Sequence, residues 1–126
     1  MAMTITETVE NYLETILMLE KELSDVHAVD LARRLGFSKP TVSVALKNYK
    51  EAGLVTVSEN GHLSLTALGR EIAEPIYERH NLIADFLVAL GVDEEIACQD
   101  ACKLEHDLSE ESFKALKTHY LLKIKQ

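Results

Sequence analysis

The sequence is poor in the features that mark membrane, secreted and catalytic proteins. It has no tryptophan, two cysteines and two prolines, and none of its apolar runs approaches the roughly 20 residues that a membrane helix needs. Its acidic start lacks the basic-then-apolar order of a signal peptide, so we expect a cytoplasmic protein. Cys98 and Cys102 are one helical turn apart, poorly placed to bridge each other, and are expected to be reduced. Because the chain also lacks a glycine-rich phosphate loop, we do not expect an enzyme.

The negative charge of the chain is unevenly distributed. The net charge is −8, which argues against a nucleic-acid partner, but residues 25–70 carry a charge of +2 between an acidic start (−4) and an acidic end (−6). A basic middle segment between acidic flanks is compatible with DNA binding if something neutralises the flanks.

The apolar pattern predicts a mainly helical protein with one small β-hairpin. Helical periodicity is found over residues 6–23, 28–36, 37–53, 67–91, 92–109 and 110–126. Residues 54–66 instead alternate with a period of two around Asn60-Gly61, a strong hairpin signal. Pro75 should mark a kink or a break in the 67–91 stretch.

Two short helices joined by a glycine turn and followed by a hairpin have the layout of a winged helix-turn-helix. In that fold the second helix enters the major groove and the hairpin reaches the neighbouring backbone or minor groove. We expect its hydroxyl and basic side chains to bind base edges and phosphates. The candidate DNA-binding residues are Arg33, Arg34, Ser38, Lys39, Pro40, Thr41, Ser43 and Lys47. The alternatives are a solvated helical surface or a winged helix that binds protein.

A stretch near the end of the chain, "DACKLEHDLS" at 100–109, carries candidate metal ligands on one helix face. At 100° per residue, Cys98, Cys102, Glu105 and His106 fall on one side, away from a packing face that includes Leu104. Thiolate, carboxylate and imidazole at this spacing can converge on one ion, but one helix cannot surround it. The further ligands that we consider are His80 in "YERHN" and the pair Asn11 and Glu14 in the first helix, although a solvated charge is the usual reading of a single such residue.

The ordered motifs resemble the family of metal-dependent repressors that includes the diphtheria toxin repressor and the manganese transport regulator. The resemblance rests on "ENYLETI" (10–16), "DLARRLGFSKPTVSVALKNYKEAGLV" (30–55), "GHLSLTALGREIA" (61–73), "ERHNLIADFLVALGVDEE" (78–95) and "DACKLEHDLSEE" (100–111). It implies a winged helix-turn-helix DNA-binding domain over residues 1–74, followed by an all-helical metal-binding and dimerisation domain over 75–126. It also implies a homodimer on a palindromic operator that controls metal-uptake genes. We expect metal to link the first helix to the later helices, and so to hold two recognition helices about 34 Å apart.

By position, the resemblance implies that Glu14, His80, Cys102, Glu105 and His106 are metal ligands. Cys98 falls where the iron-responsive branch has a histidine. Cys102 matches the iron branch and Glu14 the manganese branch, whereas Asn11 matches neither and Ala84 replaces a usual glutamate. The chain ends before the SH3-like domain of longer members.

A thiolate favours softer ions over Mn(II). We therefore expect Fe(II) first and Mn(II) second, with Zn(II), Co(II) or Ni(II) able to bind in vitro. Two other functions stay open: a metal-independent winged-helix regulator that senses an organic ligand, and a structural zinc-binding interaction module.

Overall fold

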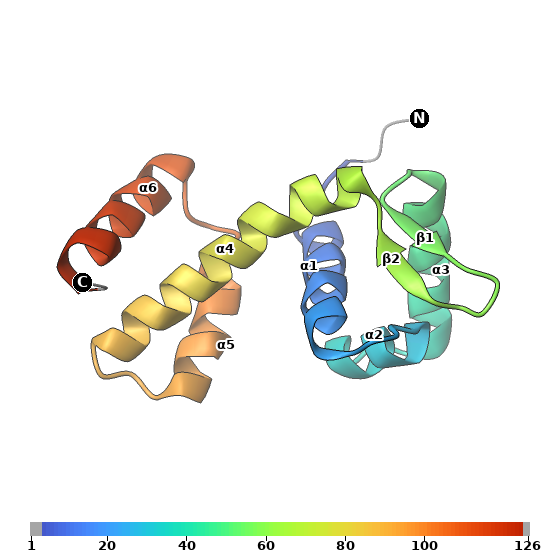
Figure 1. The fold of residues 1–126 in the computed structure, drawn as a ribbon, viewed down its shortest axis with the longest axis horizontal. Coiled ribbons are helices and arrows are strands. Elements are labelled where there is room, and N and C mark those ends of the chain that lie inside the picture. Colours follow the sequence, from blue (N-terminus) through green and yellow to red (C-terminus); the bar gives the residue numbers. More distant parts are fainter. Residues whose placement is uncertain (1–3, 125–126) are drawn as a thin grey trace. The chain divides into compact units, whose positions relative to one another are not determined.

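The structure is a computed structural model that describes residues 4–124, and it is mainly helical with one two-stranded hairpin, as predicted (Figure 1). In chain order its elements are α1 (Glu7–Glu22), α2 (Ala28–Leu35), α3 (Lys39–Glu51), β1 (Val55–Val57), β2 (Leu63–Leu65), α4 (Ala67–Ala89), α5 (Glu94–Leu104), α6 (Glu110–His119) and a π-helical turn, η1 (Tyr120–Ile124). None of the helices in residues 4–124 is both long and apolar enough to cross a membrane.

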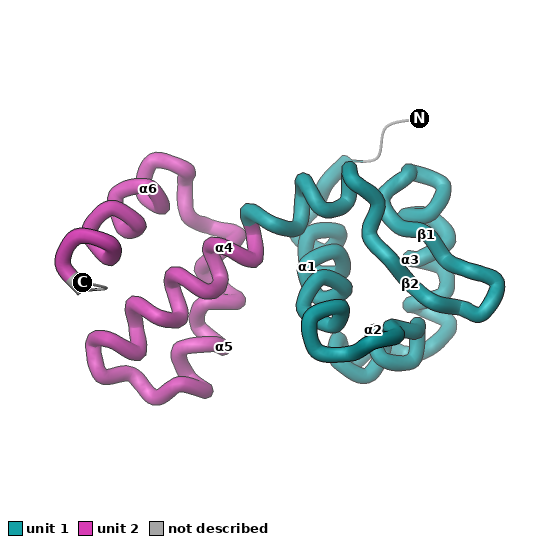
Figure 2. The backbone as a smooth tube through the Cα atoms, in the orientation of Figure 1, with its two compact units in different colours: residues 1–75 teal, residues 76–126 magenta. Residues whose placement is uncertain are grey.

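The chain folds into two compact units, Met1–Pro75 and Ile76–Gln126 (Figure 2). The boundary between them lies inside α4, which is not broken at Pro75. A proline in a helix removes one backbone donor. Because Pro75 is exposed, water can satisfy the carbonyl that loses this donor, and helix-forming residues on both sides maintain the helix.

The first unit is a three-helix bundle with a hairpin. Thr6 and Ser38 cap α1 and α3 through their side-chain oxygens, and Gly36 adopts a left-handed conformation (φ 73°) that turns the chain between α2 and α3. Tyr12 of α1 packs edge-on against Tyr49 of α3, with ring centroids 5.2 Å apart. β1 and β2 pair antiparallel, with Val55 opposite Leu65 and Val57 opposite Leu63. Val55, Leu63 and Leu65 are buried in the apolar core and anchor the hairpin, and its five-residue loop, 58–62, is the wing.

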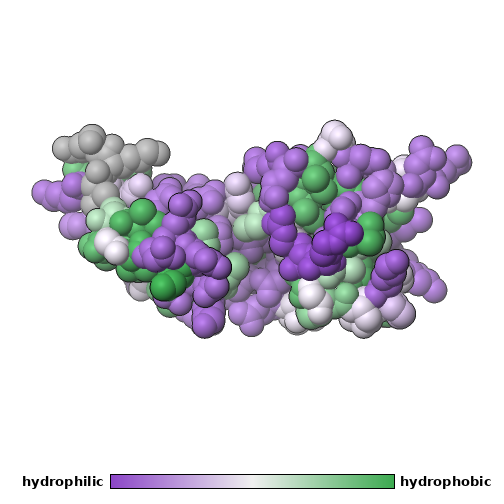
Figure 3. Space-filling view, turned by 90° about the horizontal axis from the view of Figure 1, so that it is seen from below, coloured by the Kyte–Doolittle hydropathy of each residue, from purple (hydrophilic) through white to green (hydrophobic). Residues whose placement is uncertain are grey.

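The second unit consists of the last part of α4 with α5, α6 and η1. Asp93 and Ser109 cap α5 and α6, and Ala101 of α5 packs against Ile83 and Ala84 of α4. The small alanines allow the two helices to approach closely. Large apolar side chains are also exposed on this unit (Figure 3): Val88, Leu90, Ile96, Leu104, Leu121 and Leu122.

Candidate metal centre

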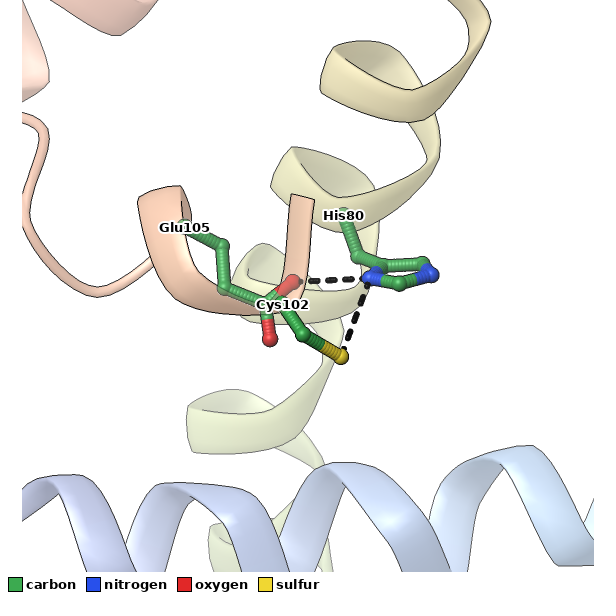
Figure 4. A group of neighbouring side chains, drawn as sticks. All are labelled: His80, Cys102 and Glu105. Carbon is green, nitrogen blue, oxygen red and sulfur yellow. Dashed lines mark hydrogen bonds and ion pairs between the residues drawn. The ribbon is translucent and has the colours of Figure 1, made fainter. Parts of the chain in front are cut away.

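Three side chains of different chemistry converge where α5 ends beside α4. Each of His80, Cys102 and Glu105 offers one ligand atom, and these atoms all lie within 4.8 Å of one another. The Nδ1 atom of His80 is 3.0 Å from Oε2 of Glu105 and 3.8 Å from Sγ of Cys102. Both contacts meet at the same ring nitrogen, as Figure 4 shows. The arrangement joins the part of α4 that lies in the second unit to the end of α5, 22 to 25 residues later in the sequence.

Glu105 is the most deeply buried member of this group. Its side chain is 0% exposed, and its second oxygen, Oε1, is 3.3 Å from Nε2 of His106. α5 ends at Leu104 and not at 109 as predicted, and Glu105 is its C-cap. Because Glu105 keeps helical angles (φ −60°, ψ −25°), its side chain still follows the direction set by α5. The carboxylate thus lies between two imidazoles that come from different parts of the chain.

These residues fit a divalent transition metal. Burying a carboxylate costs several kcal/mol unless opposite charge or hydrogen bonds compensate. Neutral imidazole, thiolate and carboxylate are the donor types that bind Fe(II), Co(II), Ni(II) and Zn(II), and a carboxylate-imidazole set also suits Mn(II). The buried side of the group is formed by Glu105 and His80, whereas Cys102 is exposed and leaves the group accessible from solvent.

The other predicted ligands differ from one another in how far they are buried. Cys98 is exposed and is absent from the potential metal-binding groups among the described residues. Glu14 is buried, with only 3% of its surface exposed, so the usual reading of a solvated helix charge is wrong for it; Asn11 is half-buried. Leu104, predicted to pack, is 42% exposed because α5 ends there.

The predicted DNA-binding residues all lie on exposed parts of α2 and α3. Ser38 and Thr41 exchange a 2.8 Å hydrogen bond at the start of α3, beside the exposed Lys39. The full set is Arg33, Arg34, Ser38, Lys39, Pro40, Thr41, Ser43 and Lys47. Hydroxyls and a lysine at a helix start can bind phosphate.

Arg34 differs from the other basic residues of this surface. Its guanidinium donates to Glu22 of α1 at 2.7 Å, and this hydrogen bond lowers the pKa of Glu22. Part of its positive charge is therefore already compensated, and its predicted phosphate contact stays a prediction.

Sequence reasoning missed a second cluster of histidine and carboxylate, in the first unit. Asp25, between α1 and α2, accepts hydrogen bonds from Nε2 of His27 (2.8 Å) and from Nδ1 of His62 in the wing. These bonds, first that from His62 and then that from His27, lower the pKa of Asp25. Leu63 also donates its backbone N–H to Val26, at 2.7 Å. No local spacing could have predicted a contact between residues 37 positions apart.

Two family profiles match the chain. Residues 4–63 match the iron dependent repressor N-terminal DNA binding domain, and residues 66–121 match the iron dependent repressor metal binding and dimerisation domain. The chain is 40% identical over 111 residues to the transcriptional regulator MntR of Escherichia coli O157:H7, covering 88% of this chain and 72% of that protein. It is 37% identical over 108 residues to the iron-dependent repressor IdeR of Mycobacterium leprae, covering 85% and 47%.

Solved structures agree with these matches. A manganese-dependent transcriptional repressor in complex with manganese superposes with a TM-score of 0.78 at 30% identity, over 87% of this chain and 51% of that one. IdeR of T. acidophilum has the same fold, with a TM-score of 0.80 at 21% identity, over 95% of this chain and 56% of that one. The chain therefore spans about half the length of these two structures.

Proposed function

Because the chain belongs to the family of iron-dependent repressors, we propose that it is a DNA-binding transcriptional repressor that responds to a divalent metal and controls genes of metal uptake or homeostasis. One observation carries the metal part of this proposal. The fully buried carboxylate of Glu105 lies between His80 and His106, with Cys102 beside it. We place this regulator in the cytoplasm, and it has no proposed catalytic activity.

His80, Cys102, Glu105 and His106 would hold the metal in this proposal. A bound divalent ion supplies the positive charge that offsets the buried carboxylate and the ionised thiol. His80 and His106 would bind the ion through ring nitrogens, and the contacts of both rings with Glu105 bring these donors together. Glu14, Asn11 and Cys98 stay proposed ligands on sequence position alone, and Cys98 has the weakest support of the three.

We propose Fe(II) as the physiological ion, with Mn(II) as the runner-up. Cys102 supports Fe(II), because a thiolate favours softer ions than Mn(II). The relatives do not separate the two ions, since one similar structure is a manganese-dependent repressor in complex with manganese and IdeR of Mycobacterium leprae is an iron-dependent repressor. Zn(II), Co(II) and Ni(II) are expected to bind in vitro.

The DNA partner in this proposal is a double-stranded, palindromic operator bound by a homodimer. α3 would enter the major groove, with Lys39, Thr41 and Ser43 at the DNA surface. The second unit leaves large apolar side chains exposed, as a dimerisation domain requires.

The proposal can be tested by measuring DNA binding with and without metal. The assay is fluorescence anisotropy under anaerobic conditions, with DNA from upstream of the protein's own coding region. We expect Fe(II) or Mn(II) to increase affinity by about 5- to 150-fold, the usual range of coupling between two sites. Equal affinity after removal of metal by a chelator would contradict the metal-dependent mechanism and favour a regulator that senses an organic ligand.

A separate measurement tests the alternative function of a structural zinc-binding interaction module, which would not bind DNA. The triple variant Lys39→Ala, Thr41→Ala, Ser43→Ala should lose operator binding, because it removes one charged and two hydroxyl contacts from the start of α3. Its metal affinity should stay that of the wild type, since none of these three residues is a proposed metal ligand. A variant that still binds operator normally would exclude α3 as the recognition helix.

A further inference from the structure

Arg79 precedes the proposed ligand His80 in α4, and its side chain reaches the segment that follows α5. Its Nη1 atom donates to the backbone carbonyl of Leu108 at 2.6 Å and to that of Glu105 at 3.3 Å. Its guanidinium carbon lies 5.0 Å from the centre of the Phe113 ring in α6. One half-buried arginine thus contacts the end of α5, the connection to α6, and α6 itself.

Of the two carbonyls that Arg79 binds, that of Glu105 lies at the C-cap of α5 and that of Leu108 in the connection to α6. The last carbonyls of a helix lack partners within the helix and carry partial negative charge, so a cation there is stabilising. A guanidinium suits this position because its donors lie in a fixed plane that can also stack on an aromatic ring. The contacts therefore restrain the backbone from residue 105 to residue 108 without involving any proposed metal-ligand side chain.

Glu105 and His106 lie within this restrained segment, and His80 is the neighbour of Arg79 in the chain. We propose that Arg79 is a positioning residue for the metal centre: by holding the 105–108 backbone against α4, it presets the distance between His80 and the carboxylate of Glu105. This inference rests on the proposed metal-binding function. In metal sites, residues that orient the ligands typically change affinity by about 10- to 100-fold when they are lost.

The neighbouring pair Glu78 and Lys117 provides a matched control. Lys117 of α6 donates to Glu78 of α4 at 3.0 Å, so this pair also joins the two helices, but it does not contact residues 105–108. Leu87 provides a second control, because it packs against the same apolar cluster as Leu108, and its truncation should lower stability while both hydrogen bonds of Arg79 can still form.

The experiment compares Arg79→Met, Arg79→Lys, Lys117→Met and Leu87→Ala in the full chain. Co(II) is the probe, because a bound thiolate gives it a charge-transfer absorption band that reports the Cys102 contact. Affinity is measured by titration of that band and by calorimetry, and the unfolding of the metal-free protein by circular dichroism. We expect Arg79→Met to weaken Co(II) binding by about 10- to 100-fold and Arg79→Lys, which can keep one hydrogen bond, to recover part of the loss. Both controls should stay within about twofold of the wild type.

Three results would overturn the inference. Wild-type Co(II) affinity in folded Arg79→Met would show that Arg79 does not position the site, while leaving the proposed function intact. An equal loss in Leu87→Ala would show that affinity follows stability alone. Absence of Co(II), Mn(II) and Fe(II) binding by the wild type would overturn the proposed function and the role of Arg79 together.

Discussion

The two units each contain a carboxylate between two imidazoles, but they place it in opposite surroundings. In the first unit Asp25 contacts His27 and His62, and its side chain is 54% exposed. In the second unit Glu105 contacts His80 and His106, and its side chain is 0% exposed. Similar residues therefore form a solvated ion-pair cluster in one unit and a desolvated group in the other.

Burial changes what such a group can do. Around Asp25, water screens the charges, so the cluster contributes little free energy beyond holding the wing near the α1–α2 connection. Around Glu105, water no longer stabilises the carboxylate, and a cation bound there gains more than it would at the surface. The buried cluster also has a third type of donor, the thiol of Cys102, which the exposed cluster lacks. Residue type alone would not have distinguished a ligand site from a surface contact.

The largest expected effect comes from neutralising the buried carboxylate. Glu105→Gln keeps the size of the side chain but removes the negative charge and one ligand oxygen. We expect divalent-metal affinity to fall by more than about 100-fold, above the usual loss for a residue that only orients ligands. Metal-dependent operator binding should be lost with it, as measured by calorimetry and fluorescence anisotropy.

Asp25→Asn is the matched control, because it makes the same change in the exposed cluster. We expect its metal affinity to stay within about twofold of the wild type, since Asp25 lies outside the potential metal-binding groups of the described residues. Equal losses in the two variants would remove the distinction between the clusters. An unaffected Glu105→Gln variant would exclude Glu105 as a ligand.

An intermediate effect is expected from substituting Cys102, whose thiol is the donor that only the buried cluster has. Cys102→Ala should weaken Fe(II) and Co(II) binding, and Cys102→Glu should shift preference toward Mn(II) by about tenfold, because oxygen donors suit Mn(II) better than sulfur does. The measurement is the ratio of Mn(II) to Co(II) affinity in each variant. Cys98→Ala is the control, since its thiol is one helical turn away and exposed. If the ratio is the same in wild type and Cys102→Glu, the thiol does not ligate the metal.

The sequence predicted most of the secondary structure because the relevant signals are local. The glycine turn between the two short helices and the hairpin around Asn60-Gly61 are both confirmed. Local sequence signals were insufficient where tertiary contacts or solvent determine whether a helix continues or ends. Pro75 was expected to mark a kink or a break, and α4 is not broken there, because the exposed position of Pro75 lets water replace the missing hydrogen bond.

The chemistry of the metal centre was partly visible in the sequence. The spacing of Cys102 and Glu105 predicted a shared helix face, and the resemblance added His80 from another helix. The burial of Glu105 and the contacts of Arg79 were not visible, because they depend on how α5 and α6 pack against α4. A single arginine that binds backbone carbonyls has no sequence signature.

The smallest expected effect concerns the pH dependence of the exposed cluster. Hydrogen bonds from His62 and His27 lower the pKa of Asp25 in the folded protein, so the ionised carboxylate stabilises the fold. A group with a lowered pKa contributes its stability above the pKa of the unfolded chain, about 4 for aspartate, and loses it as pH falls through the folded pKa. Wild type should therefore unfold at a slightly higher temperature than Asp25→Asn at pH 6, and the difference should shrink below pH 4.

This experiment also tests whether the cluster holds the wing. If it does, Asp25→Asn should speed hydrogen exchange at the amide of Leu63, which donates to Val26, at pH 6 but not at pH 3. His106→Gln, measured in the metal-free protein, is the control for a histidine outside the cluster. A difference in unfolding temperature that grows as pH falls would have the wrong sign for a carboxylate stabilised by imidazole donors, and would show that the exposed cluster destabilises the first unit.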